Sequence, residues 1–236
     1  MSEEITFYYN PRSRAVIVHW MLEEVGASYR VVTLDMEKRE HKGPDFLAVN
    51  PMGKLPTIVH RGVVVTETPA IIAYLADAFP AAGLSPATDD PARGTYYRWL
   101  FFGSGCYEPA TLDVMLKRAP LEGQQKGMAG WGCHEDVLAT LKTALTPGPY
   151  LLGDRFTAAD LYIASELAWG MMMGVPGLKG EPVFDGYVGR LRERPAFQRS
   201  IGALASVSQC MISRRHTATI GITFMKPCTS CSNEEM

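Results

Sequence analysis

The chain has 236 residues, of which 47% are hydrophobic and 20% charged, which is enough to bury the core of one large or two modest domains. The formal net charge of −2 gives no global positive field, and this argues against a nucleic acid partner. No stretch approaches the ~20 apolar residues of a membrane span, and the N-terminus has no basic and apolar secretion signal. We therefore expect a cytoplasmic protein with no membrane partner.

The first segments read as strand, helix and strand. Ile5 to Tyr9 is β-branched and aromatic, Arg14 to Val25 has helical apolar content and ends at Gly26, and Tyr29 to Leu34 is again β-rich. A single helix that joins two strands favours a right-handed unit with the strands parallel. We predict a βαβ unit.

A hairpin and a helix follow. Leu55 to His60 and Val63 to Thr66 flank a short Arg-Gly turn, which predicts two antiparallel strands. In the next segment, Thr68 can cap a helix and Pro69 can take its first position, where the missing N–H costs nothing. The order of this second unit is ββα.

The stretch from Pro80 to Pro91 is rich in Pro, Ala, Gly and Asp and separates this half from one without convincing strands. Beyond it, the sequence predicts four helices, and after about Ser206 the hydrophobic periodicity becomes weak. The predicted helices are Ala92 to Lys117, 127–145, Thr157 to Met173 and Val183 to Arg192. The predicted divisions are residues 1–80, a linker at 81–91, a helical domain at 92–205 and a tail at 206–236.

The cysteines do not form a secreted disulfide framework, because they are odd in number and all lie in the second half. We interpret them as reduced thiols: Cys106, Cys133, Cys210, Cys228 and Cys231. The C-x-x-C of the last two lies in the tail and receives no function. The five histidines are scattered without ligand spacing, so we expect no metal.

Three spaced motifs carry a family resemblance over roughly residues 5–200. NPMGKLPTI, then ETPAIIAYLAD, then FTAADLYIAS resemble the cytosolic glutathione transferases, with patterns nearest to the theta and beta classes. The resemblance implies an α/β thioredoxin-like N-terminal domain (βαβ-ββα) and an all-α C-terminal helical bundle. It also implies glutathione as co-substrate, a small apolar electrophile as second substrate, and a homodimer.

The resemblance assigns the grip on the peptide to two junctions. Pro56 is expected to be cis and to present the backbone of Leu55 to the cysteinyl part of glutathione, as an added strand would be presented. Glu67 is expected to meet the ligand's ammonium, while Thr68 and the helix N-terminus suit its γ-glutamyl carboxylate. An ordinary trans proline and a plain helix cap are the alternatives.

Two basic residues are candidates for the glycyl carboxylate. His41 opens the segment HKGPDFLAV, which resembles a theta-class segment, and Lys54 stands just before the predicted strand. Lys42 is a close substitute for either of them. The alternative is that these are solvated loop residues.

The residue that activates the thiol departs from the familiar patterns. Asn10 stands in register with the theta-class serine, and Arg14 stands at the beta-class cysteine position. An Asn10 amide, a Ser13 hydroxyl or the positive charge of Arg12 can each stabilise a thiolate. Asn10 and Ser13 are equal candidates ahead of Arg12, and Tyr9 is the outsider among the candidates, because alternation can turn its side chain into the core.

The helical domain offers structural features and a candidate acceptor pocket. Thr157-Ala-Ala-Asp160 is a capping box with Asp at the third position, and we interpret Asp160 as structural. Trp169 and Met171 to Met173 can line the acceptor pocket, although core packing is their default role. Two other functions stay open: glutathione-dependent disulfide reduction or isomerisation, and a non-catalytic transferase-like binding protein.

Overall fold

The computed structural model describes residues 4–202. The predicted tail at 206–236 lies outside the described residues, as do Cys210, Cys228 and Cys231. The two cysteines within them, Cys106 and Cys133, are free thiols.

The N-terminal part is built on a four-stranded sheet in the order β2-β1-β3-β4. Strand β1 (Ile5–Tyr9) pairs parallel with β2 (Tyr29–Thr33) and antiparallel with β3 (Thr57–His60), which pairs antiparallel with β4 (Val63–Thr66). Alternation along β1 buries Ile5 and Phe7 completely. The predicted parallel βαβ unit and the hairpin are both confirmed.

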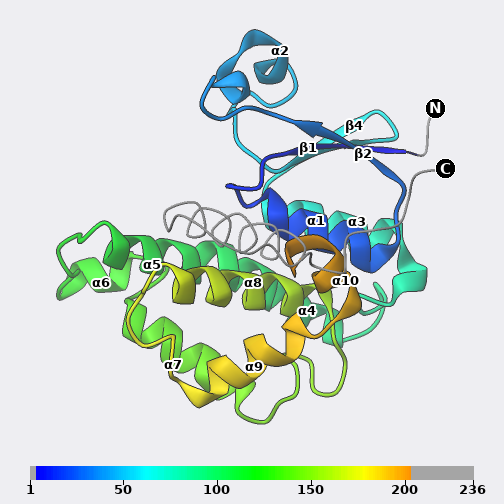
Figure 1. Ribbon diagram of the computed structural model, residues 1–236. Coiled ribbons are helices and arrows are strands. Elements are labelled where there is room, and N and C mark those ends of the chain that lie inside the picture. Colours follow the sequence, from blue (N-terminus) through cyan, green and yellow to red (C-terminus); the bar gives the residue numbers. More distant parts are fainter. Residues whose placement is uncertain (1–3, 203–236) are drawn as a thin grey trace, which may run out of the picture.

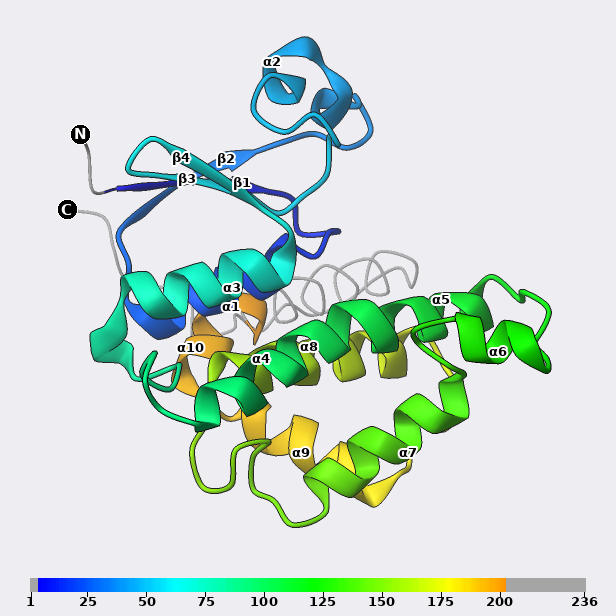
Figure 2. The same cartoon turned by 180° about the vertical axis from the view of Figure 1, so that it is seen from behind.

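Two helices cover the sheet face that looks toward the rest of the chain. They are α1 (Ala15–Val25) and α3 (Thr68–Ala78), while the short η1 (Glu40–Lys42) and α2 (Pro44–Leu47) lie on the opposite side (Figures 1 and 2). Helix α1 ends at Gly26, whose φ of 65° is the left-handed conformation that glycine adopts without steric cost. The thioredoxin-like fold class is confirmed.

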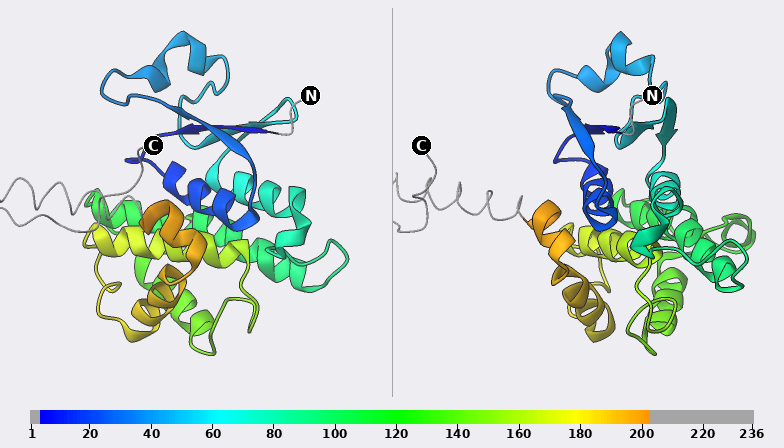
Figure 3. Two further views of the ribbon diagram at one scale, coloured as in Figure 1. Left: turned by 45° about the vertical axis from the view of Figure 1, so that its right-hand side comes forward. Right: turned by 90° about the vertical axis from the view of Figure 1, so that its right-hand side faces the viewer.

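The second part consists of helices packed below α1 and α3 (Figure 3). Helix α8 lies at its centre, contacts α1, α3, α4 and α9, and is buried over most of its length. The elements are η2 (Pro80–Ala82), α4 (Ala92–Phe102), η3 (Gly103–Tyr107), α5 (Glu108–Met115), α6 (Gln124–Met128), α7 (His134–Leu145), α8 (Ala158–Met172), α9 (Pro182–Arg192), α10 (Pro195–Phe197) and η4 (Gln198–Gly202).

Three helix predictions differ from the structure in detail. The segment predicted as one helix at 127–145 is split between α6 and α7, because glycines interrupt it and Gly132 takes a φ of 64°. The predicted helix from Ala92 to Lys117 contains a π-helical turn at Gly103, where a Cβ would lie 2.5 Å from the Tyr162 ring. Helix α3 begins at Thr68, so the cap position belongs to Glu67 and not to Thr68.

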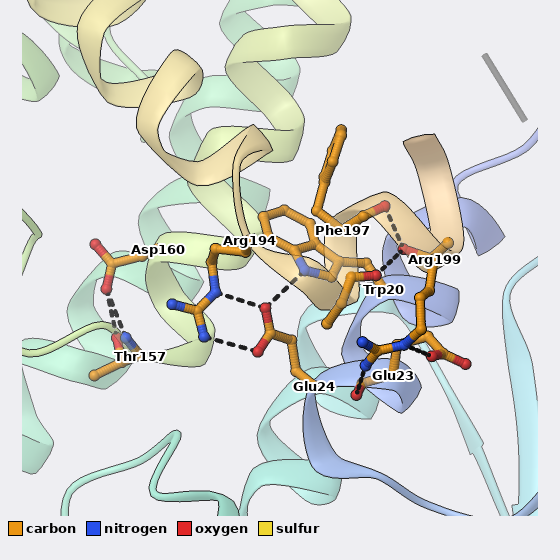
Figure 4. Close-up of polar contacts among 10 residues, drawn as sticks. Trp20, Glu23, Glu24, Thr157, Asp160, Arg194, Phe197 and Arg199 are labelled. Carbon is orange, nitrogen blue, oxygen red and sulfur yellow. Dashed lines mark hydrogen bonds and ion pairs between the residues drawn. The ribbon is translucent and has the colours of Figure 1, made fainter. Parts of the chain in front are cut away.

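The predicted capping box at the start of α8 is present in both of its parts. Thr157 and Asp160 exchange their side-chain and backbone hydrogen bonds there (Figure 4). Among the described residues, no helix combines the length and hydropathy needed to cross a bilayer. The cytoplasmic location stays a prediction.

Candidate active site

A cavity of about 620 Å³ opens between the loop before β3, the first turns of α3, and α4, and we call it the proline cavity. The Leu55–Pro56 peptide at its wall is cis, as the resemblance implied. The loop before it is held by Asn50, whose amide donates to the carbonyl of Lys54 at 2.9 Å and to the hydroxyl of Thr57 at 3.1 Å. Five of the predicted ligand-binding residues line this cavity together: Lys54, Leu55, Pro56, Glu67 and Thr68.

The junction before α3 has an unusual backbone. Glu67 adopts φ 64° and ψ 120°, a conformation that a non-glycine residue adopts at a cost of about 1–3 kcal/mol and that is concentrated at functional sites. Its side chain is exposed, whereas Thr68 is 6% exposed. The first N–H groups of α3 have no partner within the helix, and free N–H groups of this kind are suited to an anion.

The two basic candidates for the glycyl carboxylate separate in the structure. Lys54 is exposed and lines the proline cavity, but His41 is not among its lining residues. Lys42 donates from Nζ to the carbonyl of Met52 at 2.7 Å, so its ammonium is engaged with the loop. The geometry favours Lys54.

The predicted thiol-activating residues are largely occupied by local contacts. Asn10 is 6% exposed, donates its amide to the carbonyl of Leu34 at 2.8 Å, and accepts from the backbone N–H of Arg12 at 2.9 Å. Ser13 donates its hydroxyl to the carbonyl of Asn10 at 2.7 Å. The guanidinium of Arg12 is largely exposed and pairs with Glu37 at 2.9 Å.

Tyr9, the outsider among these candidates, packs its ring at 5.4 Å from that of Phe7 and at 5.6 Å from that of His19. Burial raises the pKa of the Tyr9 hydroxyl. A phenol with a raised pKa is less ready to ionise.

A second cavity, of about 710 Å³, lies between α1, α8, α9 and η4, and we call it the tryptophan cavity. Its lining is mainly apolar and includes Trp20 from α1 with Trp169 and Met172 from α8. Arg12 and Ser13 face this cavity and are absent from the lining of the proline cavity. Such a concave apolar site with a few polar groups suits a small organic ligand.

Arg14 lines both cavities, and our sequence interpretation had not assigned it a role. Its guanidinium forms an ion pair of 2.9 Å with Glu108, lies 3.6 Å from Glu166, and stacks 5.3 Å from the centre of the Trp169 ring. The one available signal was its register with the beta-class cysteine position. Its two carboxylate partners lie far from it in the sequence, and no local pattern predicted that they would meet it.

The fold and these cavities are typical of one class of two-domain enzyme. In that class a thioredoxin-like domain binds a peptide-like ligand beside a cis-proline, and a helical domain completes the site. Family models agree: "Glutathione S-transferase, N-terminal domain" matches residues 3–77 and "Glutathione S-transferase, C-terminal domain" matches residues 128–195. The chain belongs to the glutathione S-transferase family and is an enzyme of that kind.

Individual relatives align with this chain over nearly the whole of their own length. Glutathione S-transferase 3 of Zea mays is 32% identical over 213 residues, which is 85% of this chain and 94% of that protein. Glutathione S-transferase GstA of Escherichia coli O157:H7 is 29% identical over 198 residues, or 83% and 96% of the two chains. A sphingomonad glutathione S-transferase solved with glutathione superimposes with a TM-score of 0.68 at 30% identity, covering 84% of this chain and 98% of that one.

Proposed function

We propose that this chain holds glutathione in the proline cavity and transfers its thiolate to an apolar electrophile held in the tryptophan cavity. The observation that carries this proposal is the position of Arg14, which lines both cavities. A sulfur bound on one side of Arg14 and an electrophilic carbon bound on the other would meet next to it. Holding two reactants in this way is the main contribution of such a site.

The charges of glutathione match the proline cavity. Its two carboxylates suit Lys54 and the N-terminus of α3 with Thr68, its ammonium suits Glu67, and its cysteinyl backbone suits the backbone of Leu55. The sphingomonad relative binds glutathione in a structure that superimposes on this one. These residues are our proposal for the ligand contacts.

Transfer requires that the thiol ionise. A thiol of pKa ~8.5 is only about 3% ionised at neutral pH, and lowering that pKa by two units requires roughly 2.7 kcal/mol. We propose that the Arg14 guanidinium supplies this electrostatic stabilisation at the junction of the cavities. Asn10 and Ser13 stay candidate donors, although each would have to give up a present hydrogen bond to serve the sulfur.

Calorimetry with glutathione tests the binding proposal. Replacing Thr68 by valine removes a hydroxyl while keeping the shape, and we expect Kd to rise roughly 10- to 100-fold because a hydrogen bond to a charged group contributes about 1.5–3 kcal/mol. Thr143→Val on α7, where the hydroxyl donates to the carbonyl of Ala139, is the matched control and should bind as the wild type does.

If the wild type gives no heat with millimolar glutathione and does not conjugate a chloronitrobenzene, the proposal is wrong. Reduction of a mixed disulfide, measured beside conjugation, tests the reductase or isomerase alternative. That alternative gains no support from the described cysteines, because neither Cys106 nor Cys133 lines either cavity. Family membership favours an enzyme over a non-catalytic binding protein.

We also propose a homodimer. Apolar side chains stand exposed on β4 and α4, where Val63 is 55% and Phe101 is 70% exposed, and Phe101 also lines the proline cavity. Sedimentation should give a particle of twice the 26.0 kDa chain mass, and Phe101→Glu should shift it toward the monomer. A 26.0 kDa wild-type particle at micromolar concentration would contradict the proposal.

A further inference from the structure

Glu166 is the buried acidic group in the wall of the tryptophan cavity. It lies on α8, is 2% exposed, and is one of the residues that line the cavity. Within residues 4–202 its Oε2 has no hydrogen-bond partner, and its Oε1 lies 3.6 Å from Nε of Arg14. An unpaired carboxylate in such a place is costly, whereas a neutral carboxylic acid is tolerated.

The charges around Arg14 indicate where a proton resides. One guanidinium faces two carboxyl groups, so the cluster is neutral only when one of the two is protonated. Glu108 has two close partners, Nη2 of Arg14 in an ion pair at 2.9 Å and the hydroxyl of Tyr162, which donates a hydrogen bond at 2.7 Å. In the part of the chain that the structure describes, the Glu166 carboxyl has the longer contact with Arg14, so the charge belongs on Glu108 and the proton on Glu166.

We propose that Glu166 is a general acid of the proposed transferase, which protonates a co-substrate oxygen that becomes negative as the sulfur attacks, as the oxygen of an epoxide does when its ring opens. The inference rests on the proposed function and adds a proton-donating residue to it. A group that donates a proton within the cavity favours substrates that develop an oxyanion over those that release a halide, since chloride requires no proton.

The step balances in atoms and charge. The thiolate sulfur attacks an epoxide carbon, the carbon–oxygen bond breaks with its electron pair on oxygen, and that oxygen takes the proton of the Glu166 carboxyl. The products are a hydroxy thioether and a Glu166 carboxylate beside Arg14. Solvent then returns a proton to Glu166, in place of the one that the thiol released on ionisation.

The electrostatic surroundings support the protonated state near neutral pH. Burial first, and then the Glu108 carboxylate, raise the pKa of Glu166 to about 8, against the opposing effect of Arg14. Tyr107 donates its hydroxyl to the backbone carbonyl of Glu166. Tyr162 lies on α8 as Glu166 does, and burial and the Glu166 carboxylate raise the pKa of its hydroxyl. Both tyrosines therefore stay neutral and add no charge.

Among the described residues, the other charged side chains that line the cavity are arginines. Arg192 from α9 and Arg12 from the first loop line it, and Arg12 is already paired with Glu37. A protonated Glu166 keeps the Arg14 cluster neutral, so a thiolate can approach Arg14 without repulsion from a second free carboxylate. The same proton therefore serves thiolate binding and ring opening.

The test compares styrene oxide with 1-chloro-2,4-dinitrobenzene in the full chain. In Glu166→Gln the ratio of kcat/KM on the epoxide to kcat/KM on the chloronitrobenzene should fall about 100-fold, the usual contribution of a general acid. The wild-type rate on the epoxide should fall as pH rises through about 8, and this falling limb should vanish in Glu166→Gln. In Glu108→Gln the limb should move to lower pH, because Arg14 then faces a single carboxylate.

The outcomes are distinct. An unchanged substrate ratio in Glu166→Gln, or a wild type that conjugates the chloronitrobenzene but not the epoxide, overturns the role of Glu166 and leaves the proposed function standing. A wild type inactive on both substrates overturns both. A measurement of unfolding tests the protonated state without any activity assay. Because the pKa of Glu166 is raised in the folded protein, the free energy of unfolding of the wild type, relative to that of Glu166→Gln, should decline from about pH 4.5 to 8. If this difference does not change with pH, Glu166 is not protonated as we propose.

Discussion

Replacing Asp160 by alanine is expected to lower the free energy of unfolding by about 3–5 kcal/mol, since each buried donor left without an acceptor costs about 1–3 kcal/mol. Asp160 is fully buried and accepts four hydrogen bonds. They come from the backbone N–H of Leu151 at 2.8 Å, from the backbone N–H and hydroxyl of Thr157, both at 2.9 Å, and from the Tyr187 hydroxyl at 2.9 Å. The carboxylate therefore ties the loop before α8 to α8 itself and to α9.

Urea unfolding followed by tryptophan fluorescence measures the effect. Asp136→Ala on α7 is the matched control, because that carboxylate is 62% exposed and forms its ion pair with a half-exposed Lys126. An exposed ion pair contributes about 0–1 kcal/mol, so the control should lose no more than that. If Asp160→Ala loses as little as Asp136→Ala, the buried network does not stabilise the helical domain as we argue.

The sequence predicted best those elements whose signals are local. The strands at Ile5–Tyr9 and Val63–Thr66 were predicted with their observed bounds, because β-branched residues between turn signals leave few alternatives. The capping box at Thr157 was equally readable, since all its partners lie within one turn. The break between α6 and α7 was missed, although the glycines at 130 and 132 marked it.

In the candidate site, too, some residues could be predicted from the sequence and others could not. The motif around Pro56 and the junction at Glu67 were identified through the family resemblance, and the structure brings them to one cavity. The roles of Asn10 and Ser13 could not be predicted, because a sequence does not show that the Asn10 amide is already bonded to the carbonyl of Leu34, just after β2, or the Ser13 hydroxyl to that of Asn10. Nor does it show that Arg14 meets carboxylates from α5 and α8, since only the packing of the helical domain against α1 brings them together.

The other large effect on stability is expected at the C-terminal end of α1, where a contact between the domains lies apart from that of Arg14. Arg194 donates from Nε and Nη2 to the two oxygens of Glu24, at 2.6 and 2.8 Å, and Glu24 also accepts from the indole of Trp20 at 2.9 Å (Figure 4). The Glu24 side chain is only 7% exposed, and the guanidinium stacks 3.6 Å from the centre of the Phe156 ring. This bidentate pair joins the helical domain to the thioredoxin-like domain.

Arg194→Ala is expected to lower the free energy of unfolding by about 3 kcal/mol, because removing one partner of a buried pair leaves an uncompensated charge. The chain offers a matched control a few residues away. Arg199 pairs with Glu23, the neighbour of Glu24, at 2.8 Å, but its side chain is 56% exposed. Arg199→Ala should therefore cost less than about 1 kcal/mol.

Salt separates the two pairs further. At 1 M NaCl the screening length is about 3 Å, so the exposed Arg199 pair should lose its small contribution while the enclosed Arg194 pair keeps most of its own. Urea unfolding of both variants at low and high salt measures this. Equal losses for Arg194→Ala and Arg199→Ala would mean that burial of Glu24 does not govern the contact, and that the domains are held together by apolar packing such as that of Trp20 on Phe197.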